Sequence, residues 1–162
     1  MTPGEWALMC FESPEITNIR LSHLFNFLKD SKMKKVFLGG TCNDSQWRES
    51  LKPLLTIEYF DPVVKDWDEA AYQRELHERA TCDFCLYVIT PKMTGVYSIA
   101  EVIDDSNKRP EKTVFAVLGA DGENEFDKVQ LKSLAAVSKM VKANGGVTCE
   151  SLQDVADFLN KA

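Results

Sequence analysis

The feature that most constrains the fold is an uninterrupted apolar stretch near the middle of the chain. Between Asp83 and Thr90 the sequence reads Phe-Cys-Leu-Tyr-Val-Ile, with no charged residue among the six. A strand with one face in water alternates apolar and polar residues, whereas a strand that is covered on both faces does not. The stretch therefore predicts a central strand of a parallel sheet, with helices packed on both of its faces.

Further short apolar segments lie on either side of this stretch, and segments with helical spacing separate them. Strands are predicted at residues 36–38, 56–60, 113–118 and 147–149 in addition to 83–90. Helices are predicted near Trp47, at 69–80, at 97–107, at 126–143 and after Ser151. Strands that alternate with helices form parallel sheets through right-handed crossovers. The expected fold class is α/β, a flavodoxin-like three-layer α/β/α arrangement with a five-stranded parallel sheet.

Polar residues mark where several of these helices begin. Asp68 and Ser151 are predicted N-caps, and Asn43, Asp44 or Ser45 is predicted to cap the helix that follows the first strand. Upstream, an apolar stripe with helical spacing over residues 16–28 predicts a further helix. We therefore expect two parts: residues 1–33 as an N-terminal helical extension packed on the core, and residues 34–162 as the α/β domain.

Charge and cysteine content exclude several functional classes. The formal net charge is -6, which argues against a nucleic-acid polymer as partner because binding a phosphate backbone needs a basic face. No apolar run approaches the roughly 20 residues that span a membrane. Cys82 and Cys85 form a CxxC pair without a second pair or a nearby histidine, so we interpret them as buried free thiols. Reduced thiols in a chain without a secretion signal predict a cytoplasmic protein, and we expect no metal and no cofactor.

Ligands of such sheets bind beyond the carboxyl ends of the strands, which directs attention to four loops. These are residues 39–44, 61–68, 90–101 and 119–125. In the first, Gly39 and Gly40 let backbone N–H groups approach an anion, although they are equally consistent with a tight turn. In the second, Trp67 beside carboxylates is suited to hold a nucleobase or a sugar, and the alternative is a helix start with the indole packed underneath.

The third loop carries the most chemistry. Glu101 falls in the first turns of a predicted helix, among apolar residues, with Tyr97 and Ser98 on nearly the same helix face. A carboxylate, a phenol and a hydroxyl can act as nucleophile, orienting group and sugar-hydroxyl partner. The alternative is a solvated glutamate that the helix dipole favours. The segment 104–109 reads as a solvated helix end, and Asp83 reads as a structural residue.

Taken in order, several segments resemble the nucleoside 2-deoxyribosyltransferase-like family, in its phage and bacterial branch. They are Val-Phe-Leu-Gly-Gly-Thr at 36–41 with Trp47-Arg48, Phe-Asp-Pro-Val-Val at 60–64 with Asp66-Trp67, the stretch 83–91, and Thr-Gly-Val-Tyr-Ser-Ile-Ala-Glu-Val at 94–102. The resemblance implies an enzyme that cleaves or transfers the N-glycosidic bond of a (deoxy)nucleoside or nucleoside 5′-monophosphate. It places a glutamate nucleophile at Glu101 and a phosphate-holding serine at Ser98.

The resemblance and the loop positions together define the predicted site. The predicted catalytic residues are Glu101, Asp66 as proton donor to the leaving base, and Tyr97. The predicted substrate-binding residues are Gly39, Gly40, Thr41, Asn43, Trp47, Asp61, Pro62, Trp67, Thr90, Met93, Thr94, Gly95 and Ser98.

Two other functions stay open beside this enzyme. Classical transferases of the family carry a tyrosine on the first-strand loop, where this chain has Gly-Gly-Thr, and this departure favours hydrolysis or a nucleotide-binding module without turnover. Cleavage of NAD is a further alternative, because its nicotinamide bond is also N-ribosidic. The expected partner is a small nucleoside or nucleotide, and the resemblance together with the apolar segment 16–28 predicts a homo-oligomer.

Overall fold

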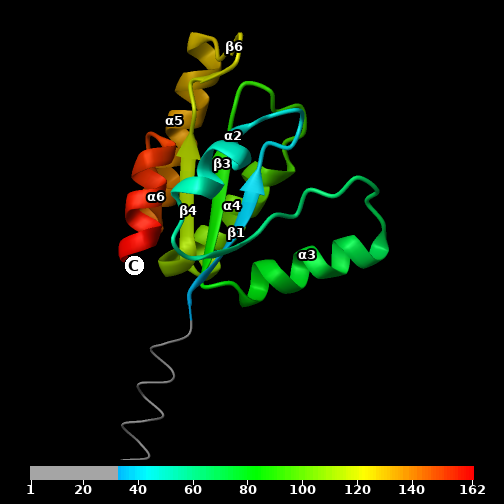
Figure 1. Ribbon diagram of the computed structural model, residues 1–162. Coiled ribbons are helices and arrows are strands. Elements are labelled where there is room, and N and C mark those ends of the chain that lie inside the picture. Colours follow the sequence, from blue (N-terminus) through cyan, green and yellow to red (C-terminus); the bar gives the residue numbers. More distant parts are fainter. Residues whose placement is uncertain (1–32) are drawn as a thin grey trace, which may run out of the picture. The chain divides into compact units, whose positions relative to one another are not determined.

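Five parallel strands form the sheet at the centre of the α/β unit (Figure 1). The computed structural model describes residues 33–162, so the helix predicted at 16–28 and its packing on the core lie outside the described residues. The strands are β1 (Lys35–Gly40), β2 (Glu58–Phe60), β3 (Phe84–Ile89), β4 (Thr113–Val117) and β7 (Val147–Cys149), in the order β2-β1-β3-β4-β7. This arrangement confirms the predicted five-stranded parallel sheet of the flavodoxin-like kind.

The central strand β3 is buried along its whole length, as its composition predicts. It pairs in parallel with β1 on one side and β4 on the other, and Gly40 lies opposite Val88 in the register. Alternate side chains enter two separate apolar clusters, with Leu86 and Val88 in one and Tyr87 and Ile89 in the other. The lack of alternation in the sequence follows from this, because both faces of the strand are dry.

Four helices cover the two faces of the sheet and give the three layers (Figure 1). On one face α2 (Trp47–Leu51) and α6 (Leu152–Lys161) pack against the sheet, and on the other face lie α4 (Tyr97–Lys108) and α5 (Lys128–Ala143). Short 3-10 turns follow α2 at Lys52–Leu54 and precede β4 at Pro110–Lys112. Within residues 33–162, no helix is long and apolar enough to cross a membrane.

Helix α3 (Glu69–Thr81) differs from the other helices because its sides are largely exposed. Figure 1 shows it to one side of the sheet, beyond β1. Its only buried residue is Arg79, in the last turn. An apolar stripe therefore does not hold α3 in place, and polar contacts near its C-terminal end take on that role.

The predicted caps are partly confirmed. The side chain of Asp68 accepts a hydrogen bond from the backbone N–H of Ala71, and Ser151 caps α6 in the same way. The cap predicted for α2 is wrong, because α2 begins after Gln46, which makes no side-chain cap hydrogen bond. The candidate residues have other partners: Ser45 donates to Asp121, and the Asn43 amide oxygen accepts from the backbone of Thr94.

The predicted polar loop at 119–125 contains a small hairpin that the sequence analysis missed. It consists of β5 (Ala120–Asp121) and β6 (Asn124–Glu125), joined through Gly122, whose φ of 64° is the left-handed conformation that such a turn requires. The Asp121 carboxylate contacts Ser45 and lies 3.5 Å from Lys92 Nζ. The hairpin thereby links the loops that follow β1, β3 and β4.

The packing of β1 against β3 can be tested at Gly40, because β3 leaves no space for a side chain at this position. Its φ is 114°, and an added Cβ would lie 2.1 Å from the carbonyl oxygen of Val88. Gly40→Ala should therefore lower the free energy of unfolding by at least about 2 kcal/mol, measured by urea denaturation. The matched control is Gly119→Ala, where nothing lies within 4 Å of the added Cβ. Equal stability of the two variants would contradict the described strand contact.

Candidate functional site

A cavity of about 530 Å³ opens at the carboxyl end of β1, beside the first turns of α4. That volume falls in the range of small-molecule sites. The loop after β1, the loop before α3, the exposed helix α3 and the first turns of α4 form its walls. The lining residues are Gly39, Gly40, Cys42, Arg48, Pro62, Trp67, Tyr72, Glu75, Leu76, Tyr97, Ser98 and Glu101.

Glu101 lies in the wall of this cavity and is 7% exposed. Its Oε1 accepts a hydrogen bond from Arg79 Nη1 at 3.2 Å. Among the described residues, every fully buried side-chain oxygen or nitrogen has a hydrogen-bond partner. Within residues 33–162 Oε2 has no such partner, so it is the oxygen that keeps contact with open space. The predicted alternative of a solvated surface glutamate is therefore wrong.

Burial changes the protonation of this carboxyl group. It raises the pKa of Glu101 to about 7, with smaller contributions from Glu75 and Asp105 in the same direction, while the charge of Arg79 lowers it. At neutral pH the group is therefore divided between the carboxylate and the protonated acid. A nucleophile must be the carboxylate, so the chemistry of this site depends on groups that favour the charged form.

Behind Glu101 lies a buried polar cluster centred on Asp105, which is fully buried. Arg79 donates to both Asp105 oxygens, from Nε at 3.0 Å and from Nη2 at 2.7 Å. Tyr87 donates its hydroxyl at 2.5 Å, and Arg109 donates at 2.7 Å. The prediction of a solvated helix end at 104–109 is thus wrong at Asp105. Burial alone would raise the pKa of this carboxyl group, but the hydrogen bonds from Arg79, Tyr87 and Arg109 hold it below its usual value.

Arg48, a buried residue of α2, holds the loop after β1 through hydrogen bonds. Its guanidinium donates to the carbonyl oxygens of Leu38 at 2.9 Å and of Thr41 at 2.7 Å. Trp47 Nε1 also donates to the Thr41 carbonyl, at 2.8 Å, while the Thr41 hydroxyl accepts from the backbone N–H of Thr90. These bonds satisfy the carbonyl groups at the end of the strand and fix the loop that lines the cavity.

The structure brings together about half of the predicted site residues. Seven of them line the main cavity: Gly39, Gly40, Pro62, Trp67, Tyr97, Ser98 and Glu101. An adjoining cavity of about 110 Å³ shares three of these and adds Thr41, Asn43, Met93 and Gly95. Five others line neither cavity: Trp47, Asp61, Asp66, Thr90 and Thr94.

Those five residues have other surroundings. Trp47 and Thr90 are buried, Asp66 and Thr94 are exposed, and Asp61 forms ion pairs with Lys52 at 2.9 Å and Arg48 at 3.4 Å. Asp66 is thus the predicted catalytic residue that the structure leaves outside the cavity. The alternative interpretation of Trp67 as packed underneath the helix start is also wrong, since the indole is 62% exposed and lies beside the tilted ring of Tyr72, with ring centroids 5.5 Å apart.

Helix α3 contributes site residues that the sequence analysis missed. Tyr72, Glu75 and Leu76 line the cavity, and Arg79 reaches Glu101 from the next turn. Their spacing is i, i+3, i+4 and i+7, which places them on one face of the helix. The sequence contains this spacing. Because the four side chains are aromatic, acidic, apolar and basic, however, they do not form an apolar stripe that would indicate a shared face.

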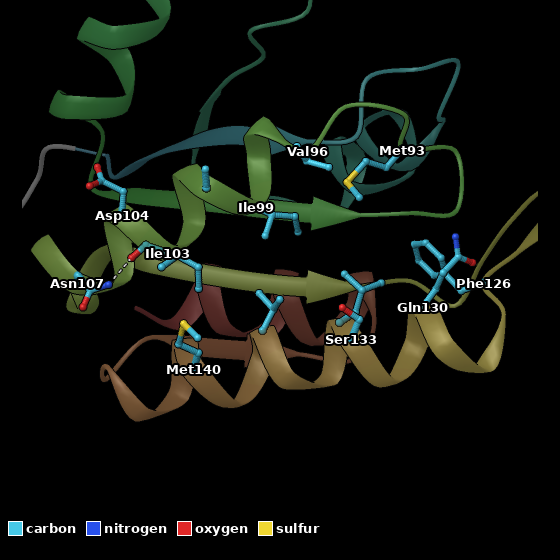
Figure 2. A pocket seen from close by; sticks show the side chains of 13 residues that line it. Met93, Val96, Ile99, Ile103, Asp104, Asn107, Phe126, Gln130, Ser133 and Met140 are labelled. Atoms are coloured by element: carbon cyan, nitrogen blue, oxygen red, sulfur yellow. Dashed lines mark hydrogen bonds between the residues drawn. The ribbon is translucent and has the colours of Figure 1, made fainter.

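A larger groove of about 960 Å³ runs between α4 and α5. Figure 2 shows side chains of the two helices facing each other across it, Ile99 and Ile103 from α4 and Ser133 and Met140 from α5. Among the described residues that line it, the single carboxylate is Asp104, which pairs with Lys108 at 2.7 Å and with Arg79 at 3.5 Å. The groove is apolar and holds no buried nucleophile, so we assign the chemistry to the smaller cavity.

The two cysteines of the CxxC pair lie in the core. Cys82 and Cys85 are free and buried, as predicted, and burial raises the pKa of these thiols to about 11 and about 12. Over the described range 33–162, no three or more His, Cys, Asp or Glu side chains gather as metal ligands would.

Comparison with known protein families identifies the family of this chain. The family model described as nucleoside 2-deoxyribosyltransferase like matches residues 33–117, which is more than half of the chain. The matched range runs from β1 to β4 and contains Arg79, Glu101 and Asp105. No curated protein and no solved structure matches.

Because the pKa of Glu101 is raised, this group should lower the free energy of unfolding as the pH rises. The folded protein holds this proton up to about pH 7, whereas the unfolded chain releases it near 4.5, so stability falls as the pH rises between these values. Glu101→Gln lacks this titration and should be more stable than wild type by about 1–3 kcal/mol at pH 8, with little difference at pH 4.5. Urea unfolding at both pH values measures this, and a difference that does not change with pH would contradict it.

Proposed function

The chain belongs to the nucleoside 2-deoxyribosyltransferase-like family, and on that premise we propose that it cleaves or transfers the N-glycosidic bond of a nucleoside or nucleoside 5′-monophosphate, with Glu101 as nucleophile. The observation that carries the proposal is a buried carboxylate in the wall of a nucleoside-sized cavity. One of its oxygens is held by Arg79 and the other keeps contact with open space.

The proposed reaction proceeds in two steps. A Glu101 oxygen attacks the anomeric carbon while the bond to the base nitrogen breaks, and the base leaves with the bonding electron pair and takes up a proton. This forms a glycosyl ester on Glu101, and water or a second base then displaces the ester from the sugar. A carboxylate suits this reaction because its charge stabilises an oxocarbenium-like transition state before the new bond forms.

The proton for the leaving base needs a second acid. Asp66 was predicted for this role but is exposed and does not line the cavity. Glu75 is half-buried and shares the cavity with Glu101, which makes it the better-placed carboxyl group. The rings of Trp67, Tyr72 and Tyr97 also line the cavity and offer flat apolar surfaces for a nucleobase.

Removing the nucleophile tests the proposal directly. Release of free base should be measured for a panel of nucleosides, nucleoside monophosphates and NAD. Glu101→Gln should slow release by about 10³-fold or more while substrate binding, measured by calorimetry, changes little. The matched control is Glu69→Gln, which removes an exposed carboxylate of α3 that contacts Gln73.

Other outcomes separate the alternatives. Release of nicotinamide from NAD alone would favour the NAD-cleaving alternative, and tight binding of a nucleotide without release of base would favour a binding module. Full activity of Glu101→Gln would contradict the proposed nucleophile. The predicted homo-oligomer also stays a prediction, which light scattering over a range of concentrations would test.

A 5′-monophosphate is the substrate form that a second observation favours. Helix α4 begins after Val96, which makes no side-chain cap hydrogen bond, and the Ile99 N–H already donates to the Val96 carbonyl; among the described residues, the N–H groups of Tyr97 and Ser98 are the ones that stay available to an anion. The adjoining cavity of about 110 Å³ lies at this helix start, and Ser98 and Gly95 line it together with Asn43. This volume is suited to a phosphate group next to a sugar in the main cavity.

The phosphate proposal has its own test. Ser98→Ala should raise the KM for a nucleoside monophosphate about 10-fold and leave the KM for the corresponding nucleoside unchanged, because one hydrogen bond to a charged group is lost. Steady-state kinetics on the two substrates measures the difference. Ser50→Ala, at an exposed position of α2, is the control. An equal effect of Ser98→Ala on both substrates would show that the hydroxyl does not contact phosphate.

A further inference from the structure

The C-terminal turn of α3 is the place where this exposed helix meets the candidate nucleophile. Arg79 is the only buried residue of α3, and its guanidinium lies among the polar groups of α4. Its contacts there are charged or polar, so hydrogen bonds and ion pairs hold this junction in place of apolar packing. The question is whether that geometry only holds the helix or also acts on Glu101.

The orientation of the guanidinium is set by Asp105. The two groups form a paired contact, with Arg79 Nε to Oδ2 at 3.0 Å and Nη2 to Oδ1 at 2.7 Å. Asp105 is in turn held by Tyr87 and Arg109. The cavity is not lined by Asp105, Tyr87 or Arg109. The groups that orient the guanidinium therefore lie where a substrate does not reach them.

Further hydrogen bonds of Arg79 go to Glu101, while Nη2 also lies 3.5 Å from Asp104 Oδ2. Nη1 reaches the carboxylate Oε1 at 3.2 Å, and Nη2 reaches the backbone carbonyl of the same residue at 3.2 Å. Arg79 therefore contacts both the side chain and the backbone of Glu101. It occupies one carboxylate oxygen and leaves the other facing open space.

Resting on the function proposed above, we propose that Arg79, oriented by Asp105, is a positioning residue that favours the charged form of Glu101 and directs the carboxylate oxygen it does not bind toward the cavity. Arg79 itself is absent from the lining of the main cavity, so it acts through Glu101.

The charges around Glu101 determine how this shows in a pH profile. Arg79 is a cation in direct contact, whereas the carboxylates Glu75 and Asp105 oppose ionisation and burial opposes it most strongly. Asp105 acts on the charge of Glu101 from behind the cavity. The titratable and charged groups that line a cavity together with Glu101 are Tyr72, Glu75 and Arg79 on α3, Tyr97 and Asp104 on α4, Arg48 on α2, and Cys42 in the loop after β1. Loss of the Arg79 charge leaves the opposing carboxylates in place, so the pKa of Glu101 rises further.

Two substitutions of Arg79 separate charge from orientation. In the full-length chain, Arg79→Met removes both, so kcat at pH 7 should fall about 100-fold and the acid limb of the kcat profile should move up by about one pH unit. Activity should recover partly near pH 9, where Glu101 ionises again. Arg79→Lys keeps the charge but lacks the two-pronged contact with Asp105, so kcat should fall about 10-fold with the acid limb unmoved. In both variants KM should change less than kcat.

The matched control is Arg74→Met, the same change on the same helix. Arg74 lies over the ring of Phe60 with its guanidinium carbon 5.3 Å from the ring centroid, and it does not contact Glu101. Its kcat profile should match wild type. Thermal melts of all variants identify any that fail to fold, and a folded Arg79→Met with the acid limb of wild type would overturn the proposal.

A readout without activity separates this inference from the proposed function. The stability difference between Glu and Gln at position 101 can be measured against pH in the wild-type and in the Arg79→Met or Arg79→Lys backgrounds. In wild type, the stability advantage of Gln over Glu should grow with pH until folded Glu101 is ionised. If Arg79 favours the charged carboxylate, this growth should continue to higher pH in Arg79→Met. An unchanged pH dependence would overturn the role of Arg79 even in an active enzyme. A shifted dependence in a protein that releases no base would support that role while the proposed reaction fails.

Discussion

The ion pair between Arg79 and Asp105 connects the exposed helix α3 to the helix that carries Glu101. Buried ion pairs contribute little net stability, because removing two charges from water costs about as much as their attraction returns. Loss of one partner is costly, however, since it leaves a buried charge unpaired. The pair therefore specifies an arrangement more than it stabilises the fold. Through it, the cavity wall formed by α3 and the carboxylate of Glu101 keep one relative position.

The placement of Glu101 in the cavity wall lowers the stability of the fold. A carboxylate in this wall is less stable than one in water, and the pKa of about 7 expresses that penalty. A glutamine would fit the same space without it. Selection for stability alone would not retain such a group, whereas a nucleophile has to be partly desolvated and still ionisable near neutral pH. Both the penalty and its partial relief by Arg79 agree with the proposed glycosidic chemistry.

Much of the fold could be predicted because its main determinants are local in sequence. The run from Phe84 to Ile89 predicts a strand that is covered on both faces, and it is buried throughout. Asp68 and Ser151 predict helix starts through side chains that bond to backbone only three residues away. The α2 cap was predicted wrongly because Ser45 has a distant partner in Asp121, 76 positions along the chain. A local rule cannot include that competitor.

For the candidate site, the sequence by itself determined which loops converge, since the carboxyl ends of parallel strands share one edge of the sheet. It also marked Glu101 with Tyr97 and Ser98, because helical spacing puts these residues on neighbouring positions of one face. Only the tertiary structure decided that Asp105 is a buried anchor instead of a solvated residue, that Asp66 lies outside the cavity, and that Arg79 reaches the carboxylate. The physical reason is that burial and charge pairing depend on which helices meet in the folded domain. Arg79 and Asp105 are 26 positions apart and come together only because α3 and α4 do.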